Sequence, residues 1–194
     1  MTLNRDLAPS VAIVTLNWNG LDFLDPFLTS ASLQTYNNFF TVLVDNGSKD
    51  VSLDFVSKNF PEVEVLDLGV NKGYSKGFNE GINFALEKGA EYILISNNDV
   101  ILHKDIIKAG VSLFTKESQI GYMSGKVYNI NDKNRFQFAG GRIQNRFDGP
   151  NRGEMELDIG QYEEKEYFDY MDDVCILVRA QMVKAIGSYD EDFF

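Results

Sequence analysis

The sequence is short of cysteine and of positive charge, and each shortage excludes a class of protein. A single cysteine, Cys175, excludes an internal disulfide and is typical of a reducing compartment. It lies in the apolar run VCILV, which favours a core thiol over a nucleophile. The 18 Lys and Arg residues face 29 Asp and Glu residues, a net charge of -11. Because phosphate backbones require a basic face, no nucleic acid is expected as a partner.

Long apolar runs are also missing. No stretch approaches the roughly 20 apolar residues of a membrane span, and the first ten residues, MTLNRDLAPS, lack the apolar stretch of a signal peptide. A cytoplasmic protein is therefore expected. Internal repeats, low-complexity tracts and flexible linkers are absent, so the 194 residues predict a single domain with a sizeable core.

What is present in the first half is a regular alternation of two patterns. Short apolar runs rich in β-branched residues predict buried strands at 11–16, 41–45, 63–68 and 92–96. Helical periodicity separates them, at 22–33, 49–60, 75–88 and after Asp105, with Asp22 and Ser75 as candidate N-caps. The alternation predicts an α/β fold with a doubly wound, mostly parallel sheet.

The second half has a different pattern. Strands or extended segments are expected at 120–129, 135–144 and 167–179, and a short helix at 180–187. The polar piece 145–166 reads as a long surface loop, which in a compact domain is often functional.

Asparagine follows each of the four predicted parallel strands. The strand ends read LNWNG, DNGS, GVNKG and SNND. One such end is an ordinary turn. Ligands of open parallel sheets, however, bind beyond the carboxyl ends of the strands, which all meet at one edge. Four polar ends at that edge predict a ligand site.

Two phosphate-binding signatures are missing from these ends. The chain has no G-x-x-x-x-G-K-[ST] and no G-x-G-x-x-G after the first strand, which disfavours P-loop NTPases and dinucleotide dehydrogenases. Gly73, Gly77 and Gly81 are instead spaced by four, and we expect this stripe to pack closely on the sheet.

Four segments together resemble a known family. VAIVTLNWNG, VLVDNGSKD, NKGYSKGFNEGI and YILISNNDVIL are similar to family 2 glycosyltransferases with the GT-A fold, and nearest to the rhamnosyltransferase-like enzymes of bacterial surface polysaccharide synthesis. The later segments GYMSGKVYN, FAGGRI and DVCILVRAQMVKAIGSYDEDFF also fall where that family has them. The resemblance implies one GT-A domain over 1–194, with a smaller antiparallel C-terminal part. Residues 1–118 would bind the nucleotide-sugar, and residues 119–194 would face the acceptor.

The resemblance also implies which strand-end residues bind the donor. Asp45 would accept a hydrogen bond from a pyrimidine N–H, and the end of the first strand would line base and ribose. The remaining donor contacts would come from the ends of the third and fourth strands. The implied nucleotide-sugar-binding residues are Leu16, Asn17, Asn19, Asp45, Asn71, Gly73, Lys76, Asn97 and Asn98. Trp18 either stacks on the base or packs beside the first strand, and packing is favoured.

The family has a D-x-D triplet after its fourth strand, which here reads Asn97-Asn98-Asp99. Asp99 is then the only carboxylate left to hold Mg²⁺ or Mn²⁺, with further oxygen ligands from the donor diphosphate and water. The cation would neutralise charge on the leaving nucleoside diphosphate. The alternative is a turn in which Asn98 or Asp99 satisfies local amides.

An inverting transfer needs a general base for the acceptor hydroxyl. In the family this base lies in a Glu-Asp pair after the motif matched by YDEDFF, so we expect it beyond Phe194 and this chain to be incomplete. Asp172, Asp173 and Asp192 are weak substitutes. Relatives carry small residues where MDDVC has Asp172 and Asp173, so these carboxylates either bind hydroxyl groups or are solvated charges.

The expected function is inverting transfer of a hexose or deoxyhexose from a UDP- or dTDP-sugar to a glycan or lipid-linked acceptor. A lipid-linked acceptor would imply peripheral association with the inner membrane face. The sequence does not predict whether the protein is a monomer or an oligomer. One alternative is a module that binds nucleotide-sugar through Asp45 and Asp99 without catalysis. Another is a sugar nucleotidyltransferase, which should have a basic, Gly-rich stretch after the first strand; LNWNGLDF has one Gly and no Lys or Arg.

Overall fold

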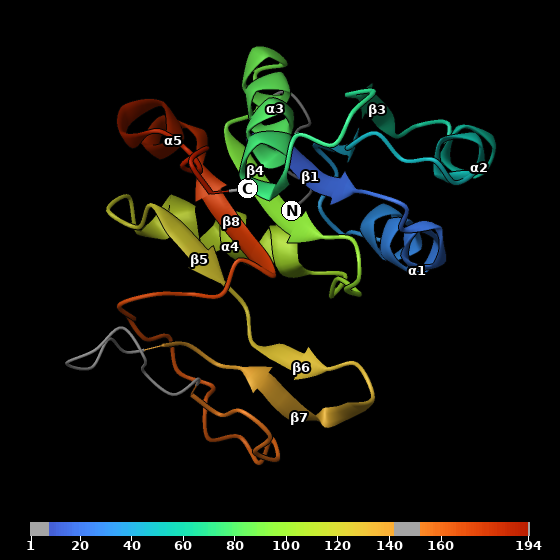
Figure 1. Cartoon of the computed structure of the whole chain (residues 1–194). Helices are drawn as coiled ribbons and strands as arrows, with labels where there is room; N and C mark the ends of the chain where they lie inside the picture. Colours follow the sequence, from blue (N-terminus) through green and yellow to red (C-terminus); the bar gives the residue numbers. More distant parts are fainter. Residues whose placement is uncertain (1–7, 142–151, 194) are drawn as a thin grey trace.

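The protein is built around one twisted six-stranded sheet, seen in a computed structural model that describes residues 8–141 and 152–193. The strand order is β3-β2-β1-β4-β8-β5 (Figure 1). The strands are β1 (Val11–Asn17), β2 (Phe39–Asp45), β3 (Glu64–Asp67), β4 (Tyr92–Asn97), β5 (Tyr122–Ser124) and β8 (Cys175–Arg179). The first four are parallel, whereas β8 runs antiparallel to β4 and β5 antiparallel to β8. The predicted α/β sheet with an antiparallel C-terminal part is confirmed.

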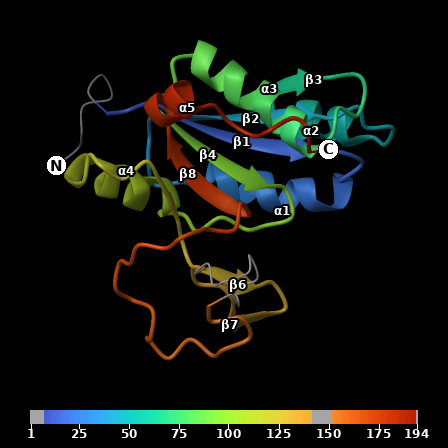
Figure 2. The same ribbon diagram turned by 60° about the vertical axis from the view of Figure 1, so that its left-hand side comes forward.

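Helices cover both faces of this sheet. They are α1 (Leu21–Ser32), α2 (Ser52–Asn59), α3 (Tyr74–Glu87), α4 (Ile106–Lys116) and α5 (Ala180–Ile186). Apolar side chains of α1, α2 and α4 pack into one core cluster, and those of α3 and α5 pack into a second cluster on the other face. Figure 2 shows α3 and α5 on one side of the strands and α1 and α4 on the other.

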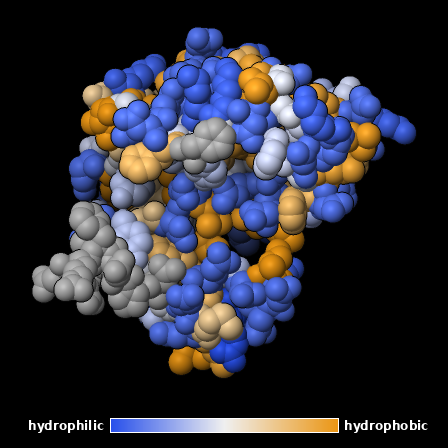
Figure 3. Space-filling view, viewed as in Figure 1, coloured by the Kyte–Doolittle hydropathy of each residue, from blue (hydrophilic) through white to orange (hydrophobic). Residues whose placement is uncertain are grey.

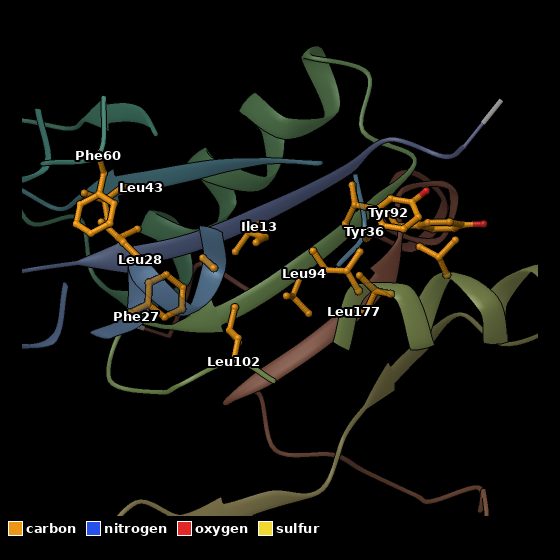
Figure 4. Close-up of a cluster of buried hydrophobic side chains, with 14 of the residues drawn as sticks. Ile13, Phe27, Leu28, Tyr36, Leu43, Phe60, Tyr92, Leu94, Leu102 and Leu177 are labelled. Carbon is orange, nitrogen blue, oxygen red and sulfur yellow. The ribbon is translucent and has the colours of Figure 1, made fainter. Parts of the chain in front are cut away.

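Strand β1 illustrates why the sequence folds this way. Val11 and Ile13 belong to the first cluster, and Ala12 and Val14 belong to the second. Successive side chains of a strand point to opposite faces of the sheet. All four are fully buried because helices cover both faces. Figure 4 shows Ile13 in the first cluster, together with Phe27 and Leu28 of α1. A continuous apolar run is therefore what a central parallel strand requires.

Gly77 and Gly81 lie in α3 and pack on the sheet as predicted, whereas Gly73 is the N-cap of this helix. A methyl group on Gly81 would lie 2.5 Å from Cγ2 of Val44 and 2.7 Å from Cγ1 of Val14. A methyl group on Gly77 would lie 2.6 Å from Cδ1 of Leu16. Only glycine lets this helix approach β1 and β2 so closely.

The second half differs from the expectation in its details. The predicted strand 120–129 breaks at Gly125 and Lys126, giving β5 in the main sheet and β6 (Val127–Asn129) in a separate hairpin with β7 (Asp132–Phe138). Of 167–179, only β8 is a strand, because the preceding residues cross back from the hairpin to the main sheet. The end of the predicted strand 135–144 and the start of the loop 145–166 lie outside the described residues.

Two further expectations concern the ends of helices. The N-cap positions of α1 and α3 are Gly20 and Gly73, not Asp22 and Ser75. Asp22 lies in the first turn of α1, and Ser75 is buried inside α3. Over residues 8–141 and 152–193, none of the helices has the length and apolar character needed to cross a membrane.

Candidate active site

The carboxyl ends of the parallel strands are aligned at one edge of the sheet. Asn17 pairs in register with Asp45 across β1 and β2, and Asp45 pairs with Asp67 across β2 and β3. Leu16 pairs with Asn97 across β1 and β4. The register therefore brings the predicted strand-end residues together, as the parallel topology requires.

Asn17 is the centre of a buried network that joins the ends of β1, β2 and β4. Its Nδ2 donates to Oδ2 of Asp45 at 3.1 Å and lies 3.2 Å from Oγ of Ser48. Its Oδ1 accepts from Nδ2 of Asn98 at 2.9 Å. A side chain on Gly20 would collide with these two amides, 2.6 Å from Oδ1 of Asn17 and 2.8 Å from Nδ2 of Asn98. The glycine keeps the network intact.

Asp45 is bonded within this network. The carboxylate is fully buried, and its Oδ1 accepts from the backbone N–H of Ser48 at 2.8 Å. Both oxygens therefore have protein partners, so the direct pyrimidine contact implied by the resemblance requires Asp45 to become exposed. The accessible groups at this strand end belong to Trp18 and Asn19.

A second network orders the end of β3 and the start of α3 through Asn46, which the sequence reasoning did not single out. Its Nδ2 donates to Oδ1 of Asn71 at 3.0 Å and to the carbonyl of Gly73 at 3.1 Å, and its Oδ1 accepts from the N–H of Lys72 at 2.8 Å. Gly73 has φ +86°, a conformation that glycine adopts without strain. The loop therefore presents backbone at the N-terminus of α3, where anions are favoured.

The lysines beside this loop are paired. Lys76 forms an ion pair of 3.2 Å with Glu191, and Lys72 forms one of 2.7 Å with Glu80. Both pairs are partly exposed, and ion pairs of this kind contribute little to the free energy of folding. Lys76 can therefore leave Glu191 for a diphosphate at small cost.

The triplet after β4 offers a single exposed carboxylate. Asn97 and Asn98 are half-buried, and Asp99 is exposed. Within residues 8–141 and 152–193, Asp99 has no hydrogen bond or ion pair, and His, Cys, Asp and Glu residues form no group of three that could hold a metal ion. The donor set fits a cation that receives one carboxylate from the protein and the rest of its oxygen ligands from a diphosphate and water.

Three residues near this edge differ from what the sequence led us to expect. Trp18 is 57% exposed, so the packing interpretation is wrong, and stacking on a ligand is the role left open. The side chain of Leu16 packs against Gly77 of α3, which leaves its backbone at the strand end. Tyr74, the first residue of α3, was missed; its hydroxyl lies 3.1 Å from Oδ1 of Asn97 and 3.0 Å from Oδ2 of Asp173.

The three candidate bases lie in different surroundings. Asp173 faces Tyr74. Burial, with the Asp173 carboxylate beside it, raises the pKa of Asp172. Asp192 is exposed, and its backbone N–H donates to Oδ1 of Asp190 at 3.0 Å, as in a local turn. Asp172 and Asp173 therefore border the strand-end edge, and Asp192 belongs to a turn.

The molecule is hollowed between the main sheet and the hairpin (Figure 3). A cavity of about 300 Å³ follows the free edge of β5 and extends to Phe138 in the hairpin. Lys126, Arg152, Tyr162 and Phe168 also line it. None of the predicted donor-site residues lines this cavity, and apart from Leu113 of α4 its lining residues come from the second half of the chain.

These features define an α/β protein with a network of polar side chains at the carboxyl edge of its sheet. The sequence matches the model of glycosyl transferase family 2 over residues 10–183, and the chain therefore belongs to this family. The expected family and the GT-A fold are confirmed. Membership favours a glycosyltransferase over a nucleotidyltransferase.

Solved structures with the same fold are distant in sequence. S. aureus TarS 1-349 in complex with UDP is similar with a TM-score of 0.70 and 18% identity, over 94% of this chain and 51% of that chain. Mannosyltransferase PcManGT from Pyrobaculum calidifontis, in complex with GDP-Man and Mn²⁺, has a TM-score of 0.63 and 15% identity, over 97% and 50%. The chain thus spans about half the length of these structures. No curated protein matches the sequence.

Proposed function

We propose that this chain binds a UDP- or dTDP-sugar with Mg²⁺ or Mn²⁺ and takes part in inverting transfer of the sugar to a glycan or lipid-linked acceptor in surface polysaccharide synthesis. The observation that carries the proposal is the register of the strand ends, which brings Asn17, Asp45 and Asn98 into one network with Asp99 next in the chain. The expected setting is the cytoplasm, at the inner membrane face if the acceptor is lipid-linked.

The ends of β1 and β2 are proposed to hold the nucleoside. Trp18 and Asn19 supply exposed aromatic and amide groups for the base and ribose. The Asn17–Asp45 pair fixes the backbone beneath them, and Asp45 contacts the base only if binding opens its bonds to Ser48 and Asn17. If these bonds stay closed, Asp45 is a positioning residue. If binding opens them, Asp45 accepts a hydrogen bond from the pyrimidine N–H.

The ends of β3 and β4 are proposed to hold the diphosphate. Asn71 and Gly73 place the N-terminus of α3 beside it, Lys76 supplies a positive charge, and Asn97 and Asn98 supply amide donors. Asp99 would hold the cation, which stabilises the leaving nucleoside diphosphate when bound. The cation would supply positive charge beside the diphosphate in a chain whose net charge is -11.

The second half, 119–194, is proposed to face the acceptor within a single domain whose first half, 1–118, binds the donor. The cavity along β5 supports this division, because its aromatic rings and charged groups are the side chains that sugars stack on and bind. None of the described carboxylates is assigned as the general base.

Calorimetric titration tests the proposal. UDP, dTDP and GDP are titrated into the folded protein with and without Mn²⁺. We expect UDP or dTDP to bind about tenfold more tightly with the metal, because its charge offsets that of the diphosphate. Absence of binding by all three would overturn the proposal, and a preference for GDP would overturn the pyrimidine donor. Binding without transfer to any acceptor would favour the non-catalytic module.

A further inference from the structure

The Tyr74 hydroxyl joins two parts of the chain that are far apart in sequence. It lies 3.0 Å from Oδ2 of Asp173 and 3.1 Å from Oδ1 of Asn97. Burial, with the Asp173 carboxylate beside it, raises the pKa of Tyr74, so the hydroxyl keeps its proton. A protonated phenol donates only one hydrogen bond.

The single proton lies between two acceptor oxygens, Oδ2 of Asp173 and Oδ1 of Asn97. Donation to the Asp173 carboxylate is the stronger choice, because a charged acceptor strengthens the bond. Oδ1 of Asn97 stays within hydrogen-bond distance of the same hydroxyl. Tyr74 thereby positions Asp173 beside the first residue of the Asn97-Asn98-Asp99 triplet.

The segment that carries Asp172 and Asp173 lies beside the end of β4. The backbone N–H of Asn97 donates to the carbonyl of Val174 at 3.1 Å, and Ser96 pairs in register with Cys175. In the strand order β2-β1-β4-β8, this segment follows the nucleoside end at β2 and β1 and the metal end at β4. If the proposed function holds, the donor sugar is the part of the substrate that reaches it.

Among residues 8–141 and 152–193, no lysine or arginine forms an ion pair with either of the two carboxylates, Asp172 and Asp173. Lys72, in the loop before α3, is engaged with Glu80, and Lys76, on α3, is engaged with Glu191. The ring of Tyr189, 6.0 Å from that of Tyr74, brings a second phenol and no charge. The sugar end of the site is therefore acidic and well supplied with hydrogen-bond acceptors.

We propose that Tyr74 positions Asp173, with Asp172 beside it, as a charge filter for the donor sugar, so that the transferred sugar carries hydroxyl groups and no carboxylate. Carboxylate oxygens accept hydrogen bonds from sugar hydroxyls. A carboxylate on the sugar meets like charge, and such repulsion is an effective way to reject a competing ligand. This inference rests on the proposed function and adds the class of sugar to it.

Two donors that differ only at C6 of the sugar test the filter. The glucose and glucuronic acid derivatives of the nucleotide that binds best are titrated, with Mn²⁺, into the wild type and into Tyr74→Phe and Asp173→Asn. Asp54→Asn is the matched control for the loss of a carboxylate, because this side chain is exposed on α2 and lies away from the strand-end edge. The free nucleoside diphosphate is titrated into every variant.

We expect the wild type to prefer the glucose donor by at least about tenfold, which is the size of one unfavourable charge contact. Asp173→Asn should remove most of this preference and Tyr74→Phe part of it, while affinity for the nucleoside diphosphate alone stays within about twofold. A variant that merely disturbed folding would change the affinity for the diphosphate as well.

The failures are distinguishable. If no nucleoside diphosphate binds to folded wild-type protein, the proposed function is overturned and the filter with it. If a diphosphate binds but the wild type takes both donors equally, only the filter is overturned. The filter is also overturned, and the proposed function is not, if the preference is present and unchanged in Asp173→Asn and Tyr74→Phe.

Discussion

Asn17 and Asn98, from the ends of β1 and β4, are joined by a hydrogen bond of 2.9 Å from Nδ2 of Asn98 to Oδ1 of Asn17. The other end of the Asn17 amide is committed to Asp45. One buried side chain therefore couples three strand ends. A change in the hydrogen bonds of Asp45, at the proposed nucleoside end, would also affect Asn98, the residue before the proposed metal ligand Asp99.

Replacement of Asn17 should test this coupling. Asn17→Ala leaves Oδ2 of buried Asp45 without its donor, and an unsatisfied buried acceptor costs about 1–3 kcal/mol. We expect the free energy of unfolding in urea to fall by that amount and nucleotide affinity to fall with it. Asn83→Ala, exposed on α3, is the control and should lower neither. Unchanged stability in Asn17→Ala would mean that the network does not contribute to the free energy of unfolding.

The close approach of α3 to the sheet gives a prediction about stability alone. Gly81→Ala adds a methyl group 2.5 Å from Cγ2 of Val44. Overpacking of this kind costs about 1–3 kcal/mol, against a gain of about 1 kcal/mol in helix propensity. We expect a net lower Tm in calorimetry, whereas Asn83→Ala on the same helix should be neutral or stabilising. A higher Tm for Gly81→Ala would show that the helix can move away from β1 and β2.

The acidic pair predicts a pH-dependent effect on stability. The pKa of Asp172 in the folded protein is raised above its ordinary value of 3.8 by burial and by Asp173. The neutral form is therefore favoured on folding, and the associated stability is present below pH 3.8 and lost as the pH rises through the raised pKa. Asp172→Asn should accordingly raise the Tm at pH 7.

The difference in Tm between Asp172→Asn and the wild type should vanish as the pH approaches the ordinary pKa. Asp54→Asn, at an exposed position of α2, should show no such trend. An effect of Asp172→Asn that is the same at pH 4 and pH 7 would mean that charge is not its cause.

The single thiol should be unreactive while the protein is folded. Burial raises the pKa of Cys175 to about 11, so at pH 8 its thiolate fraction is about a hundredfold below that of a free cysteine. We expect a thiol reagent to label the folded protein slowly and the urea-unfolded protein at the rate of a free thiol. Rapid labelling of the folded protein would show that the segment before β8 opens.

Much of this structure follows from patterns that a single sequence displays. The parallel strands are predictable because a strand buried on both faces carries a continuous apolar run, as β1 does at 11–14 and β4 at 92–95. The clustering of the strand-end residues is predictable because parallel topology brings the ends together without knowledge of any side-chain contact. The glycine spacing of four predicts the packing of α3 because that spacing lines one face of a helix.

The remaining features depend on contacts between distant residues. Tyr74 and Asp173 are 99 positions apart, and the residues around either one do not indicate contact with the other. The burial of Asp45 and the pairing of Lys76 with Glu191 also arise only when the chain is folded. The break between β5 and β6 was missed although Ser124, Gly125 and Lys126 interrupt the apolar residues, because the sequence does not show that the chain leaves one sheet for another there.

The most direct test of the account is the effect of Mn²⁺ on nucleotide affinity in the wild type and in Asp99→Ala. Asp99 is exposed and has no partner among the described residues, so its removal should leave the fold intact, and Asp54→Asn serves as the control. We predict that Mn²⁺ strengthens UDP or dTDP binding about tenfold in the wild type and in the control, and that Asp99→Ala loses this gain while keeping its Tm. Equal metal dependence in all three proteins would contradict the assignment of Asp99 as the metal ligand.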